Sequence, residues 1–138
     1  MSIYGTPHLR YLFNQFNKDY FGDCLPVPNF EVIHSFKYLG YFHTEIWDGT
    51  TINPIIQISD NYEYTDHQIR DVFVHEMIHY YLAYTGIDIQ CTHGVEFLKK
   101  ANELNRKYGL NITELIDISH YKRRKGTSWF KYILAKIF

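Results

Sequence analysis

Two histidines and a glutamate stand at metal-site spacing in the middle of the chain, in the segment His75-Glu76-Met77-Ile78-His79. On a helix, positions four apart lie on one face about 5.4 Å apart along the axis, so both imidazoles can reach one ion. The glutamate between them is placed to act as a base on a water held by that ion. The pattern therefore predicts metal-assisted hydrolysis, with His75 and His79 as metal ligands and Glu76 as the catalytic base.

A hydrolytic zinc site usually has three protein ligands and one open position, so the two histidines need a third partner. His93 is our preferred candidate, because it ends a loop and opens the next predicted helix, which lets the chain fold back onto the first. Gly94 follows it directly and permits close approach of the backbone. The sequence thus predicts one Zn²⁺ ion held by His75, His79 and His93.

Other side chains remain open as third ligands. Glu103 lies on the next predicted helix, and glutamate is the third ligand in His₂Glu zinc peptidases. Asp88 and Cys91 lie in the loop between the two helices. A ligating histidine also needs an acceptor that orients its ring, and Asp71, one helical turn before His75, is a candidate for that role.

The helix that carries the motif is predicted over residues 66–85. Thr65 and Gln68 fit a capping box at its start, and Gly86 ends it. Its apolar residues lie on most sides, which is typical of a buried helix. Buried imidazoles and a buried carboxylate need partners, because leaving polar groups unpaired in a core is costly. A metal ion would satisfy them.

Further helices and strands must position this helix. Apolar spacing predicts one helix from Thr6-Pro7 to near Gly22, another from Gly94 to Gly109 and a short fourth over 111–118. Strands are predicted over residues 30–35, 40–46 and 55–59, with Asp48-Gly49 as a turn. Pro54 marks an edge, a bulge or a strand start. The predicted class is α+β, with helices packed on a small, mostly antiparallel sheet and helix 66–85 at the centre.

Composition limits the remaining possibilities. The 138 residues fit one domain, with 46% hydrophobic residues and no apolar stretch long enough to span a bilayer. No signal peptide is visible at the N-terminus. The two cysteines, Cys24 and Cys91, form no paired motif, which favours a reducing compartment and predicts a cytoplasmic protein without a membrane partner.

The C-terminal segment is strongly basic. Residues 122–138 hold six basic residues and no acidic one, whereas the rest of the chain has 8 basic and 15 acidic residues. Such a tail fits either an anionic partner or a solvated, solubilising end. With an anionic partner, the aromatic residues interleaved with the cations would combine base stacking with phosphate contacts to DNA, and their alternative role is packing onto the domain. The predicted DNA contacts are Lys122, Arg123, Arg124 and Lys125. The tail fits either an apolar helical stripe over 129–138 or a hairpin from Tyr121 to Tyr132.

Taken together, these motifs resemble the SprT-like (Spartan-type) zinc metallopeptidase domain. The resemblance covers roughly residues 7–110 and rests on four groups of residues, which are the helix motif 75–79, His93-Gly94-Val95-Glu96-Phe97, the first helix with its exit through Leu25-Pro26, and Gly40 with Ile56-Gln57-Ile58-Ser59. It implies a zincin-like fold and a SprT-like domain over 1–120, followed by a basic aromatic extension over 121–138. Many bacterial members end in a Cys-x-x-Cys zinc ribbon, and this chain has no such pair.

The resemblance implies a zinc-dependent endopeptidase that cuts proteins at or crosslinked to DNA. It also implies that His75, His79 and His93 hold zinc and that Glu76 is the general base. Two other functions stay open from the residues alone. One is a small zinc peptidase of another class, with an acidic third ligand, that cleaves a regulator protein. The other is a non-catalytic, metal-stabilised module that binds nucleic acid.

Overall fold

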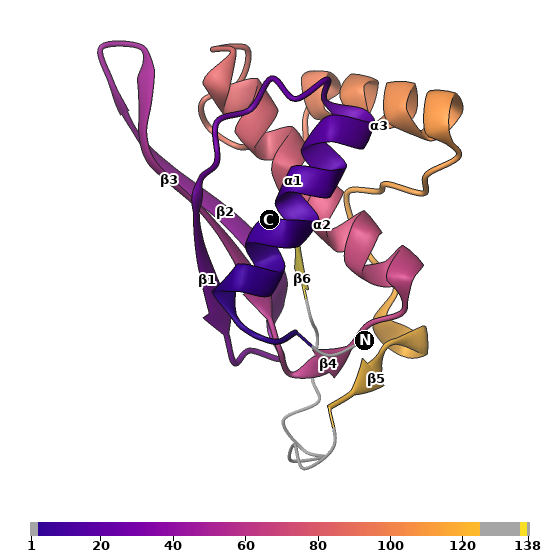
Figure 1. Cartoon of the computed structure of the whole chain (residues 1–138). Coiled ribbons are helices and arrows are strands. Elements are labelled where there is room, and N and C mark those ends of the chain that lie inside the picture. Colours follow the sequence, from indigo (N-terminus) through magenta and orange to yellow (C-terminus); the bar gives the residue numbers. More distant parts are fainter. Residues whose placement is uncertain (1–2, 125–135, 138) are drawn as a thin grey trace.

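The computed structural model describes residues 3–124 and 136–137 of the chain (Figure 1). The elements are, in order, α1 (Thr6–Tyr20), β1 (Asn29–Ile33), β2 (Tyr38–Trp47), β3 (Thr50–Ser59), β4 (Tyr62–Glu63), α2 (Asp66–Tyr84), α3 (Val95–Tyr108), a 3₁₀ turn (Ile118–His120), β5 (Lys122–Arg123) and β6 (Lys136–Ile137). In Figure 1, α1 and α2 lie together beside the main sheet. The predicted α+β class is confirmed.

The main sheet is small, as predicted, but it is mixed, whereas a mostly antiparallel sheet was predicted. Its strand order is β1-β3-β2-β6, with β2 and β3 antiparallel, β1 parallel to β3, and β6 parallel to β2. The β2–β3 connection is the predicted turn, in which Asp48 and Gly49 both have positive φ, at 52° and 73°. Two successive positive φ angles are typical of the tight hairpin turns whose twist matches that of the strands. A second sheet pairs β4 with β5.

Strand β3 is longer than predicted, because pairing with β2 continues on both sides of Pro54. His43 pairs with Ile55 and Glu45 pairs with Ile52, so the register shifts between these pairs. The proline lies at this irregularity, where it does not have to donate to the ladder. Of the three roles open to Pro54, the structure shows a bulge.

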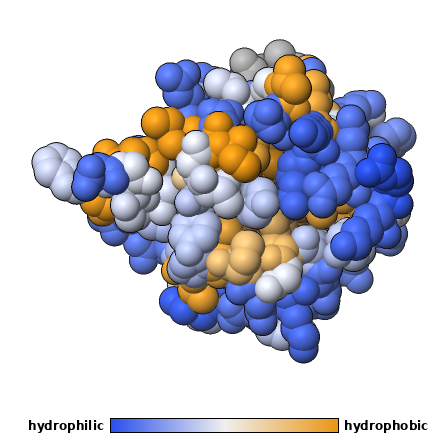
Figure 2. Space-filling model, turned by 90° about the horizontal axis from the view of Figure 1, so that it is seen from above, coloured by the Kyte–Doolittle hydropathy of each residue, from blue (hydrophilic) through white to orange (hydrophobic). Residues whose placement is uncertain are grey.

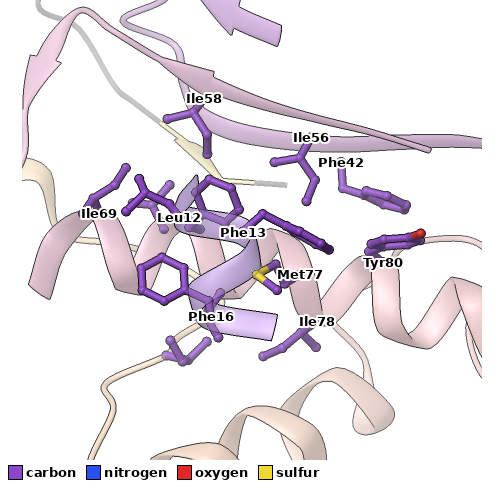
Figure 3. Packing of buried hydrophobic residues seen from close by; sticks show 14 of the residues in the cluster. Leu12, Phe13, Phe16, Phe42, Ile56, Ile58, Ile69, Met77, Ile78 and Tyr80 are labelled. Carbon is purple, nitrogen blue, oxygen red and sulfur yellow. The ribbon is translucent and has the colours of Figure 1, made fainter. Parts of the chain in front are cut away.

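The core lies between the main sheet and the helices. Side chains of one sheet face are buried in alternation, as the period of two in a strand requires. Gly40 faces Ile58 across the β2–β3 ladder, and Phe42 faces Ile56. Figure 3 shows these isoleucines pointing toward α1 and α2, whose buried residues there include Leu12, Phe13, Phe16, Ile69, Met77 and Ile78.

Helix α2 is the central helix, as predicted. Its capping box is complete, since Gln68 N donates to Thr65 Oγ1 at 3.1 Å and Thr65 N donates to Gln68 Oε1 at 3.0 Å. Gly86, with φ of 77°, lies just beyond the end of the helix. Most residues of α2 are buried, because α1 and the sheet cover part of it and α3 packs on another part. Among the described residues, no helix combines the length and apolarity needed to cross a bilayer.

The predicted short helix over 111–118 is wrong. The side chain of Asn105 takes both backbone groups of Ile112, accepting from its N–H at 2.7 Å and donating to its carbonyl at 2.9 Å. Side-chain hydrogen bonds of this kind compete with the helical pattern. Only one 3₁₀ turn follows, over Ile118–His120.

The start of the basic tail packs on the body of the domain. Strand β5 pairs with β4, and Tyr121 makes edge-to-face ring contacts with Tyr62 and Tyr64. The predicted alternatives for the tail, a helical stripe over 129–138 or a hairpin from 121 to 132, fall largely outside the described residues. The proposed division into residues 1–120 and 121–138 stays a prediction.

Candidate metal centre

The structure brings His75, His79 and His93 together. Helix α2 places the first two one turn apart, with both side chains completely buried, and the loop before α3 supplies the half-buried third. His93 Nε2 lies 3.0 Å from His75 Nε2 and 3.1 Å from His79 Nε2. Among the described residues this is the group of histidine, cysteine and acidic side chains that could hold a metal ion. These are the three residues that the sequence predicted as zinc ligands.

The hydrogen bonds around His75 fix which nitrogen faces the centre. His75 Nδ1 donates to the carbonyl oxygen of Thr113 at 2.9 Å, so its Nε2 carries a lone pair. A backbone carbonyl in this role orients a ligating ring and raises its basicity. The suggestion that Asp71 plays this part is wrong, because its carboxylate accepts from Arg70 Nε at 3.2 Å instead.

The spacing of the three nitrogens fits one divalent cation. Tetrahedral zinc with Zn–N bonds of about 2.0–2.1 Å would separate its nitrogen ligands by about 3.3 Å. The two separations here, 3.0 and 3.1 Å, are slightly shorter and need only a small outward movement of the rings. Three aromatic nitrogens aimed at one point suit a zinc ion, which accepts imidazole readily.

Phe97 of α3 supports all three rings. Its ring centroid lies 4.7 Å from that of His75, 4.8 Å from His79 and 5.0 Å from His93. It comes one helical turn after His93, so α3 carries it under the cluster, where its side chain is fully buried. From the sequence, Phe97 was identified only as part of the family resemblance at residues 93–97. Its spacing of four residues from His93 could have indicated that its ring lies close to the metal ligands.

The surroundings favour the neutral form of the imidazoles. Burial, followed by the nearby His79, holds the pKa of His75 well below its usual range. Burial, followed by His93, lowers the pKa of His79 to about 3. Burial also lowers the pKa of His93, although Glu114 opposes this effect. Because metal binds the neutral imidazole, these rings are ready to act as ligands without first losing a proton.

Glu76 projects from α2 against strand β2, and its side chain is completely buried. A Cβ placed on Gly40 would lie 3.1 Å from both Cγ and Oε2 of Glu76, and 3.2 Å from Cγ1 of Val72. A side chain at position 40 would therefore have to displace Glu76 or Val72. Gly40 therefore forms a cradle that lets α2 lie close to the sheet and sets the position of the carboxylate.

The other candidate ligands lie outside the histidine cluster. Asp88 folds the loop, since it accepts from the N–H of Gln90 at 2.9 Å and of Thr92 at 3.1 Å. Glu103 lies on α3 beside Lys100, with 3.6 Å between the charged atoms. Burial, followed by the charges of Asp88 and Glu76, raises the pKa of the Cys91 thiol to about 11, so the free thiol is protonated at neutral pH.

Comparison with known proteins agrees with this geometry. The model of the SprT-like family matches residues 9–116, which include α1 from Leu9 onward, every element from β1 to α3 and the whole histidine cluster. No curated protein matches the chain.

Proposed function

This chain belongs to the SprT-like family, a metallopeptidase family, and we propose that it is a zinc-dependent endopeptidase acting on proteins at or crosslinked to DNA. The observation that carries the hydrolytic part is the convergence of three imidazole nitrogens. His93 Nε2, from the loop before α3, lies 3.0 and 3.1 Å from the Nε2 atoms of His75 and His79, on the helix that also presents Glu76. Three protein ligands leave the fourth position of a tetrahedral ion for solvent, which is the arrangement of hydrolytic zinc sites.

The reaction follows from the residues around the cluster. Zinc held by His75, His79 and His93 would supply Lewis acidity that acidifies a water and polarises a peptide carbonyl. Glu76 accepts the proton of the attacking water at its carboxylate and delivers it to the leaving amine. Thr113 keeps His75 oriented through its carbonyl, and Phe97 packs beneath the three rings. These contacts hold the ligands in one geometry, as catalysis by positioning requires.

Exposed apolar side chains near the end of α2 support a polypeptide substrate. Tyr84, Ile87 and Ile89 are each about half exposed, at 45%, 51% and 48%. Figure 2 shows apolar surface running from the projecting β2–β3 hairpin to the middle of the face seen from above. Grouped apolar surface of this kind is typical of contact with another protein.

Replacing Glu76 with glutamine tests the hydrolytic part. Glu76→Gln keeps the size of the side chain but removes its ability to accept a proton, so we expect retained zinc and loss of casein cleavage. The measurement pairs elemental analysis with a digestion assay. The matched control is Glu103→Gln, on exposed α3 surface, which should cut as the parent does. Undiminished cleavage by Glu76→Gln would disprove the assigned base.

The DNA part of the proposal is supported by the basic segment. Lys122 lies on β5 with its side chain 79% exposed, and its Nζ is 3.2 Å from Glu63 Oε2. Arg124 Nη1 donates to Asp60 Oδ2 at 3.0 Å. These ion pairs fix the start of the basic segment on the domain surface, from which Arg123 and Lys125 would add to phosphate contacts. Lys125 lies outside the described residues.

Salt-dependent binding tests this part. We expect the Lys122→Ala/Lys125→Ala variant to bind single-stranded DNA more weakly, with the slope of log K against log salt reduced by about 1.4 if two phosphate contacts are lost. Lys99→Ala/Lys107→Ala removes the same charge from α3 and serves as the control. If the two double variants show the same DNA affinity and the same salt dependence, the basic segment does not contact DNA.

The two cysteines support a cytoplasmic location within this proposal. Cys24 is exposed and Cys91 half-buried, and both are free thiols. Free thiols, one of them exposed, suit a reducing compartment.

A further inference from the structure

The sheet edge nearest Glu76 is occupied by strand β6 of the same chain. Strand β6 pairs in parallel with β2, with Lys136 opposite Tyr38 and Ile137 opposite Gly40. Gly40 is the residue whose missing side chain makes room for the Glu76 carboxylate. Gly40 therefore has two neighbours: its Cα lies against the proposed catalytic base, and its backbone pairs with β6.

That edge has the chemistry to bind an extended polypeptide. A strand edge presents backbone N–H and C=O groups that pair with any extended chain, whatever its side chains. A scissile peptide bond must also come within reach of Glu76. Because Gly40 is in close contact with Glu76, a chain paired along Tyr38–Gly40 passes directly beside the base.

We propose that β6 restrains the peptidase as an internal occupant of the β2 edge at Tyr38–Gly40. An extended substrate must displace β6 before it can pair with β2 beside Glu76. The inference rests on the proposed peptidase function and adds a restraint on its activity.

Three features support this competition. Glu76 has no exposed surface, although a general base must reach water and a peptide bond. The strand that pairs beside it is only two residues long, so a longer extended substrate can replace its pairing and extend along β2. Helix α2 also contacts β6, which places the strand next to the helix that carries the proposed site (Figure 1).

The experiment separates backbone pairing from side-chain effects. Lys136→Pro/Ile137→Pro removes two backbone donors, and Lys136→Ala/Ile137→Ala retains them. A third variant ends at residue 135. We expect the proline variant and the shortened chain, loaded with zinc, to cleave reduced, carboxymethylated casein at least threefold faster than the full chain, and the alanine variant to stay within twofold of it. Equal rates for all chains, or equal rises for proline and alanine, would overturn the inference.

A readout that does not depend on cleavage distinguishes this inference from the proposed function. In the Glu76→Gln background, fluorescence anisotropy measures binding of the same labelled casein, and hydrogen exchange reports protection of Tyr38–Gly40. In the variants that lack β6 pairing, faster hydrogen exchange at Tyr38–Gly40 and at least threefold tighter casein binding support the inference. If these results are obtained and no variant cleaves casein, only the peptidase function is disproved. Unchanged exchange and unchanged binding overturn the inference, whether or not the enzyme is active.

Discussion

Gly40 and Glu76 are in contact across the interface between sheet and helix, so that a Cβ on Gly40 would lie 3.1 Å from Oε2 of Glu76. The strand thereby limits where the carboxylate of the helix can lie. Gly40 does not have a positive φ, so the need for glycine here is a matter of space and not of backbone conformation. A side chain of any size at this position must move either the carboxylate or the helix.

Gly40→Ala is therefore expected to reduce activity more than stability. The added methyl group presses on Glu76 and displaces its carboxylate, and a misplacement of about 1 Å can lower a rate about a hundredfold. We expect a fall in kcat of ten- to a hundredfold with zinc content retained. Steady-state kinetics and elemental analysis provide the measurement.

The control for Gly40→Ala is Glu45→Ala, an exposed change toward the far end of the same strand. It should leave kcat unchanged, because it lies away from α2. If Gly40→Ala retains full kcat, the cradle around Glu76 has no role in placing the base.

The third ligand can be identified by metal content. His93→Ala removes one of the converging nitrogens, so we expect zinc to fall below one equivalent after dialysis and the melting temperature to fall with it. Glu103→Ala should retain a full equivalent, since its carboxylate lies on α3 beside Lys100. Inductively coupled plasma mass spectrometry with thermal denaturation measures both. The reverse result, zinc lost from Glu103→Ala and retained by His93→Ala, would make the acidic residue the ligand.

The metal-free protein should lose stability as pH falls below about 6.5. The pKa of His79 is lowered to about 3 in the folded chain, whereas an unfolded histidine titrates near 6.5. Between these values the unfolded chain binds more protons, so the free energy of unfolding decreases as pH falls. For His79 alone the loss between pH 6.5 and pH 5 is about 2 kcal/mol.

Urea denaturation with a chelator, at pH 7.5 and pH 5.0, measures this loss. Carboxylates contribute to any pH dependence, so the comparison is with His79→Asn, which lacks the titrating group and should lose less stability over the same interval. The same loss in both proteins would mean that the buried ring of His79 does not carry the effect. With zinc present the dependence should steepen, because protons and metal compete for the same nitrogens.

The sequence determined the features that depend on neighbours along the chain. The capping box of Thr65 and Gln68, the four-residue spacing of His75 and His79, and the Asp48-Gly49 turn are local patterns, and each one formed the predicted structure. Helix periodicity alone placed two imidazoles on one face beside Glu76. The sequence also pointed to His93, although spacing by itself left Glu103, Asp88 and Cys91 open.

Only the tertiary structure decided the contacts between distant segments. The carbonyl of Thr113 orients His75 from 38 positions away, Phe97 packs beneath three imidazoles, and Gly40 lies against Glu76. No periodic pattern encodes these pairs, because they depend on how the strands and helices pack after they have formed. The parallel pairing of β6 with β2 is of the same kind. Local propensity builds each element, but the burial of apolar faces against one another decides which residues meet.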